Sequence, residues 1–98
     1  MTLDELKAAL GSPEPPTGLA AAVVALSYDG RGDWEAAHRV AQDIDDETGA
    51  WVHAYLHRKE GDAGNAVYWY RCARQPVARD SLEAEWERIA QALLTSSG

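Results

Sequence analysis

The dipeptide Gly-Asp occurs at residues 32–33 and again at residues 61–62, a spacing of 29 residues. Apolar or aromatic residues follow each copy at positions 5, 9 and 12 after the glycine. They are Ala37, Ala41 and Ile44 in the first copy and Ala66, Tyr70 and Ala73 in the second. Glycine often ends a helix and aspartate often caps the next one. The repeat therefore predicts two copies of one helical hairpin, the building unit of an α-solenoid.

Outside the repeat, apolar residues also recur at helical spacing, and no segment shows sustained strand alternation. We expect an all-α fold of five to six helices, in which two antiparallel hairpins carry flanking helices. The chain reads as one helical domain over residues 1–98. Its parts are an N-terminal helix (1–11), a Pro-rich linker (12–17), the two hairpins (18–76) and a C-terminal capping helix (77–98).

Polar residues at the expected helix starts can satisfy the free backbone amides there. Thr2 with Glu5 has the spacing of a capping box, and so does Asp80 with Glu83. Thr48 is placed to cap the helix that follows the acidic run at 43–48.

The charge of the chain limits its partners. There are 16 acidic and 9 basic residues, a net charge of −7, which disfavours nucleic acid as a partner. The only net-basic segment is 50–80, with five basic and three acidic residues.

The longest apolar run, residues 19–26, is far shorter than the roughly 18 residues that a membrane span requires. The first ten residues are acidic where a signal peptide is basic, and the single cysteine, Cys72, excludes an intrachain disulfide. We expect a cytoplasmic protein with no membrane partner.

Two stretches, GDWEAAHRVA and GDAGNAVYWYRCA, resemble tetratricopeptide and Sel1-like repeats. In those families a Gly-Asp turn precedes a helix with alanines and an aromatic residue at fixed spacing, and NAVYWYRCA is similar to the Trp-Tyr-x-x-Ala ending of a Sel1-like repeat. The resemblance covers about residues 18–76 and implies a helical scaffold that binds proteins. The pattern WVHAYLHRKEGD also resembles a group of small uncharacterised bacterial proteins, which implies no activity.

Residues 51–72 concentrate histidine, tryptophan and tyrosine, and three interpretations stay open for them. His53 and His57 lie one helical turn apart, and the resemblance would turn them toward the second helix of their hairpin. They can be structural, each ring hydrogen-bonded and stacked on an aromatic residue. They can share a metal ion that His38, Glu60 or Asp62 would complete, although no HExxH motif is present.

The third interpretation is a groove for a small ligand or a peptide, with aromatic walls and a few hydrogen-bond donors. An anionic ligand would suit the net-basic segment. The candidate ligand-binding residues are His53, His57, Arg58, Trp69, Tyr70 and Arg71.

The function that we expect is a non-catalytic interaction module for a protein or peptide partner, with no catalytic residue, no metal and no cofactor. The alternative is a small-ligand-binding or enzymatic protein that uses the cluster of His53, His57 and Tyr70. A homodimer with Trp34 or Trp86 in its interface is also possible, because tryptophan is enriched in such interfaces.

Overall fold

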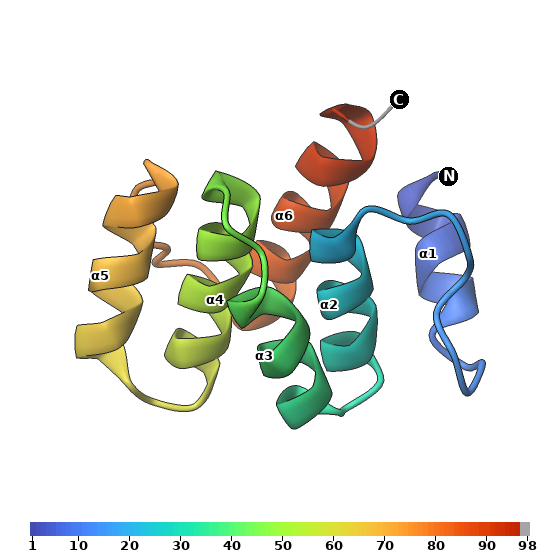
Figure 1. Ribbon diagram of the computed structural model, residues 1–98, viewed down its shortest axis with the longest axis horizontal. Helices are drawn as coiled ribbons and strands as arrows, with labels where there is room; N and C mark the ends of the chain where they lie inside the picture. Colours follow the sequence, from blue (N-terminus) through green and yellow to red (C-terminus); the bar gives the residue numbers. More distant parts are fainter. Residues whose placement is uncertain (97–98) are drawn as a thin grey trace.

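Six α-helices make up the computed structural model, which describes residues 1–96. They are α1 (Leu3–Ala9), α2 (Ala21–Gly30), α3 (Trp34–Gln42), α4 (Glu47–Lys59), α5 (Ala63–Ala73) and α6 (Leu82–Ser96). α2 packs against α3, α4 packs against α5, and the contact between α3 and α4 joins the two hairpins (Figure 1). The prediction of an all-α fold with five to six helices is confirmed.

Both Gly-Asp dipeptides form the same corner between helices. Gly32 and Gly61 adopt φ values of +89° and +90°, a conformation that glycine reaches without steric cost. In each corner the aspartate amide donates to the carbonyl oxygen five residues earlier at 2.9 Å, as in a Schellman motif. The aspartate side chain then accepts from the amide three residues later and caps the next helix. The repeat in the sequence is thus a repeat in backbone geometry.

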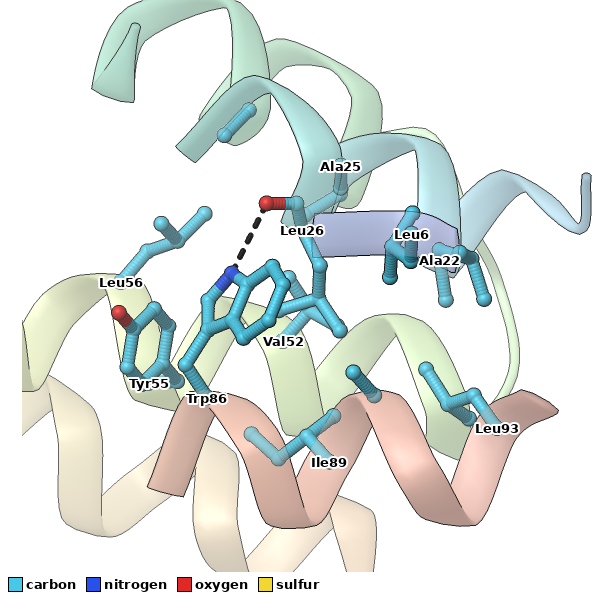
Figure 2. Close-up of a cluster of buried hydrophobic side chains, with 14 residues drawn as sticks. Leu6, Ala22, Ala25, Leu26, Val52, Tyr55, Leu56, Trp86, Ile89 and Leu93 are labelled. Atoms are coloured by element: carbon cyan, nitrogen blue, oxygen red, sulfur yellow. Dashed lines mark hydrogen bonds between the residues drawn. The ribbon is translucent and has the colours of Figure 1, made fainter. Parts of the chain in front are cut away.

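α6 covers α2 and α4 on the side away from α3 (Figure 1). Trp86 of α6 inserts between the two hairpins and donates from Nε1 to the carbonyl oxygen of Leu26 at 2.9 Å (Figure 2). Ile89 and Leu93 extend the same stripe along α6 against Val52 of α4. One apolar core therefore holds α2, α4 and α6 together.

α1 is docked on this core. Leu6 is fully buried, and Lys7 forms an ion pair with Glu87 of α6. The Thr2–Glu5 capping box is present at its start. A Pro-rich segment then leads from α1 to α2.

Two of the expected helix caps are made by neighbouring residues instead. At the start of α4, the cap is Asp46, which accepts from the amides of Thr48 and Gly49. At the start of α6, Ser81 Oγ accepts from the Ala84 amide at 3.0 Å. Asp80 instead forms an ion pair with Arg88, further along α6. The predicted caps Thr48 and Asp80 were wrong because several polar residues lie at each helix start, and spacing alone does not choose among them.

Candidate functional site

All three histidines of the chain meet where α3, α4 and α5 come together. His38 lies on α3, and His53 and His57 lie one turn apart on one face of α4. We call these three residues the histidine cluster. Trp69 of α5 lies beside it, with its ring stacked on that of His53.

The nitrogen atoms of the cluster converge. His53 Nε2 lies 3.0 Å from His38 Nε2. The ring centroids of His53 and His57 are 4.7 Å apart, and those of His38 and His57 are 5.4 Å apart. One ring nitrogen from each histidine lies within 4.8 Å of those of the other two. The three side chains therefore point toward one small volume.

Two tryptophans hold the cluster from its sides. The Trp34 ring stacks on His38 at 4.9 Å between centroids, and the Trp69 ring stacks on His53 at 4.1 Å. Trp34 is itself fixed, because its Nε1 donates to the carbonyl oxygen of Leu56 at 2.9 Å. These contacts restrict the rotamers of His38 and His53, so the cluster is held in place before any ligand arrives.

Burial keeps two of the three rings neutral. His53 is only 7% exposed, and this desolvation, together with the neighbouring His38 and His57, lowers the pKa of His53 to about 4. Burial likewise lowers the pKa of His38. At pH 7 the 3.0 Å contact between these rings therefore joins two neutral imidazoles, one donating and one accepting.

His57 is oriented by the corner that follows α4. Its Nδ1 lies 2.7 Å from Glu60 Oε1 and 3.8 Å from Asp62 Oδ2. Because an ionised carboxylate only accepts hydrogen bonds, His57 carries a proton on Nδ1. In the neutral ring, the lone pair is then on Nε2.

Arg58 and Tyr70 belong to a different polar group. Both donate to Glu85, a fully buried carboxylate on α6: Arg58 Nη1 to Oε1 at 2.8 Å and the Tyr70 hydroxyl to Oε2. Burial and the adjacent Glu85 raise the pKa of Tyr70. The expected grouping of Tyr70 with His53 and His57 around one cavity is not present, because the buried carboxylate of Glu85 takes the hydroxyl.

A groove with a volume of about 690 Å³ opens next to His53. It runs between the α3–α4 connection and α5, and we call it the groove. Its lining residues are Ala41, Gln42, Ile44, Asp45, Asp46, Glu47, Thr48, Gly49, Ala50, His53, Trp69 and Cys72. Three of them are acidic and none is lysine or arginine. Exposed Arg74, at the end of α5, pairs with Glu47 at 3.2 Å, and Asp45 and Asp46 have no ion pair among the described residues, so the groove keeps a net negative charge.

The remaining candidate, Arg71, is exposed on α5 and is not among the residues that line the groove. Cys72 is exposed and lines the groove. Arg58 is paired with Glu85, and Arg74 pairs with Glu47 at the groove, so the net-basic character of segment 50–80 does not give the groove a positive charge. The charge there disfavours the anionic ligand that the sequence suggested.

The sequence interpretation missed the acidic residues of the groove. In the sequence, Asp45, Asp46 and Glu47 belong to the acidic run that precedes a helix. Their position in the sequence could have indicated a role in the site, because they follow the first hairpin directly, where the chain turns toward the helix that carries His53. Residues of a connection show no helical periodicity that would predict which way they face. These three residues line a groove only because α5 packs against α4 beside them.

The two tryptophans considered for a homodimer interface are engaged within this chain. Trp86 is buried in the core and donates to Leu26, and Trp34 stacks on His38 and donates to Leu56. The homodimer stays a prediction.

No protein-family model, no curated protein and no solved structure matches this chain. Within residues 1–96, no helix is both long enough and apolar enough to cross a lipid bilayer. The interpretation of the site therefore depends on its own geometry and charge.

Proposed function

We propose that this protein is a non-catalytic interaction module that binds a basic, partly apolar peptide segment of a protein partner in the groove. The observation that carries this proposal is the combination of an apolar floor and an acidic rim in one groove. The resemblance to tetratricopeptide and Sel1-like repeats supports it only by analogy of fold.

Charge supports a cationic occupant. Asp45, Asp46 and Glu47 lie in sequence along one side of the groove. The carboxylate of Asp46 caps α4, and Glu47 pairs with exposed Arg74. Exposed Asp45 has no hydrogen bond or ion pair to another residue that the structure describes. A lysine or arginine of a partner would gain attraction here and would be steered to the groove by the net charge of −7.

The floor supports an apolar side chain on the same partner. Ala41 and Ala50 leave room between the helices, and Trp69 supplies an aromatic wall next to His53. A volume of about 690 Å³ suits a few peptide side chains, and peptide sites commonly combine an apolar pocket with charged groups at the rim.

The geometry does not favour the enzymatic alternative. Tyr70 donates to Glu85 in the interior, so it does not share a cavity with His53 and His57. Cys72 is exposed on α5, and the structure gives it no bond to a histidine among the described residues. A nucleophile with an adjacent base is thus absent from the described part of the groove.

A peptide selection tests this proposal directly. Twelve-residue random peptides displayed on phage are selected on the wild-type protein, and the enriched peptides are then synthesised. Their binding is followed with an environment-sensitive fluorophore on Cys72, which is the only cysteine and lines the groove. We expect enriched peptides with net positive charge and at least one large apolar residue, and an affinity that falls with added salt.

Two variants with the same change in net charge provide the control. Asp45→Lys reverses a charge on the rim and should weaken binding by about tenfold or more. Glu14→Lys makes the same change in the Pro-rich segment, away from the groove, and should leave the affinity within about twofold. Equal weakening by both variants, enrichment of acidic peptides, or no enrichment at all would each contradict the proposal.

A further inference from the structure

We infer that the histidine cluster binds one divalent transition-metal ion, and that Zn²⁺ is the ion that fits its donors. This goes beyond peptide binding in the groove. His38, His53 and His57 would be the three protein ligands, and the fourth position would be open to water.

The donor set selects the class of metal. Three imidazole nitrogens suit Zn²⁺, Cu²⁺ and Ni²⁺, whereas Mg²⁺ and Ca²⁺ require oxygen ligands. His53 and His57, one turn apart on α4, present two donors from a single helix, and His38 adds the third from α3. Three protein ligands with one open position are a common arrangement for protein-bound zinc.

The distances are close to those that a metal needs. Zinc binds imidazole nitrogen at about 2.0–2.1 Å, so two nitrogens in a tetrahedral site lie about 3.4 Å apart. His38 Nε2 and His53 Nε2 are 3.0 Å apart and need to separate by only a few tenths of an ångström. All three donor atoms already lie within 4.8 Å of one another, so a shift of the His57 ring toward the other two, with its Nδ1 still on Glu60, completes the set.

The hydrogen bonds around the cluster also match a metal site. Glu60 holds Nδ1 of His57, and this carboxylate–histidine contact orients many metal ligands in proteins. His38 and His53 have no hydrogen bond to any other described residue besides the one that they make to each other. When a metal replaces that N–H···N bond, the ring that donated it moves its proton to Nδ1, and both Nε2 atoms become ligands.

A metal ion can reach the cluster from solvent. The side chain of His57 is 13% exposed, and the adjoining Glu60 is 38% exposed. Trp34 and Trp69 close the sides by stacking on His38 and His53, which leaves the approach along the corner after α4. Aromatic stacking explains the contacts with these tryptophans, and a hydrogen bond explains the approach of His38 to His53. Neither explains why a nitrogen of His57 also lies close to both.

Titration of the metal-free protein with Zn²⁺ tests this inference. The protein is prepared without a histidine tag and treated with EDTA, and Zn²⁺ is added in competition with a chromophoric chelator. We expect one Zn²⁺ per chain, no competition from millimolar Mg²⁺, and a rise in the unfolding temperature when Zn²⁺ is present. Bound Co²⁺ should give the intense visible absorption of a tetrahedral site.

Variants separate a metal site from a structural cluster. His38→Asn and His57→Asn remove ligands that are only half-buried and should abolish stoichiometric binding, while the circular dichroism of the metal-free proteins stays helical. Glu60→Gln should weaken Zn²⁺ binding by about 10- to 100-fold, because it removes the carboxylate that orients His57. Glu83→Gln, at an exposed position on α6, should bind as the wild type does.

Three outcomes would overturn the inference: no Zn²⁺ bound at micromolar concentration, Zn²⁺ binding that survives in His38→Asn and His57→Asn, or equal affinity in Glu60→Gln and Glu83→Gln. Peptide binding measured on the same metal-free protein reports on the groove independently, because Asp45 is not part of the cluster.

Discussion

His53 connects both proposals, because it lines the groove and belongs to the histidine cluster. Its neighbours come from three helices: His38 from α3, His57 from its own helix and Trp69 from α5. A neutral ring fits between these partners, whereas a charged ring would lose its hydration and face two other histidines. The protonation of His53 is therefore linked to folding.

Acid should destabilise the metal-free protein through His53. Its pKa is about 4 in the folded state, against about 6.5 in an unfolded chain. Between these values the unfolded state binds a proton that the folded state does not, so the free energy of unfolding falls as the pH is lowered from about 6.5 to about 4. The expected loss is about 2–3 kcal/mol.

Urea unfolding in EDTA at several pH values measures this loss. The variant His53→Gln is the reference, since the carboxylates that titrate in the same window are common to both proteins. The wild type should lose more stability than the variant as the pH falls, and parallel curves would show that His53 is not held neutral by burial.

At the scale of single residues, the sequence predicted part of this environment. The resemblance to known repeats turns His53 and His57 toward the second helix of their hairpin, and in the structure the His53 ring stacks on Trp69 of α5. The stacking of an imidazole on an aromatic ring was also expected. The contact between His53 and His38 could not be derived, because it depends on how α3 packs on α4.

Among the elements, α4 is the one that carries both the site and the core. Its first turn also passes very close to the preceding connection. A Cβ atom at Gly49 would lie 2.5 Å from Cβ and 2.6 Å from the carbonyl oxygen of Ile44. This close approach sets the position of the acidic rim relative to α4.

Gly49→Ala should therefore destabilise the protein by about 1–3 kcal/mol, since the added methyl group meets backbone that cannot move freely. Alanine normally stabilises a helix relative to glycine by up to about 1 kcal/mol, so the expected sign is opposite to helix propensity.

Gly64→Ala is the matched control for this substitution. Gly64 is exposed in the first turn of α5, and a Cβ there meets nothing within 4 Å. This variant should gain a few tenths of a kcal/mol in urea unfolding. If both variants gain stability, the close contact between Gly49 and Ile44 does not exist.

The elements themselves were largely predictable, for local reasons. The Gly-Asp corners are specified by residues within one turn of each other, so the repeat alone predicted two equivalent hairpins. The helix caps at Asp46 and Ser81 were less predictable, because several residues there can cap a helix. The path of the chain in the folded protein determines which of them does so.

Across the whole molecule, α6 ties the two hairpins together through both apolar and polar contacts. Trp86 inserts between α2 and α4, and Glu85 accepts hydrogen bonds from Arg58 of α4 and Tyr70 of α5. A second buried carboxylate, Asp29 at the end of α2, is satisfied by donors of α4. Buried charges of this kind require their partners.

Replacement of Glu85 by alanine should cost about 2–4 kcal/mol, because it leaves Arg58 and Tyr70 without their acceptor in the interior. Glu83→Ala removes an exposed carboxylate from the same helix, two residues before Glu85. It should change the free energy of unfolding by less than about 0.5 kcal/mol. Similar stabilities of the two variants in thermal unfolding would argue against a buried network at Glu85.

The site was less predictable than the fold for a physical reason. Composition and spacing identify which residues can bind a ligand. They do not show that Arg58 and Tyr70 both donate to Glu85, because Glu85 reads as an ordinary surface residue of α6. The partition into a histidine cluster and a Glu85 network depends on helix packing, which is a property of the complete core.

The central claim is that His38, His53 and His57 converge on one point. The most direct measurement is NMR of their rings at pH 7 in metal-free protein, where three histidines give three sets of signals. We predict nuclear Overhauser contacts of His38 with both other histidines, and a proton on Nδ1 of His57 held by Glu60. Three rings without mutual contacts, each with the tautomer balance of a free imidazole, would contradict the account.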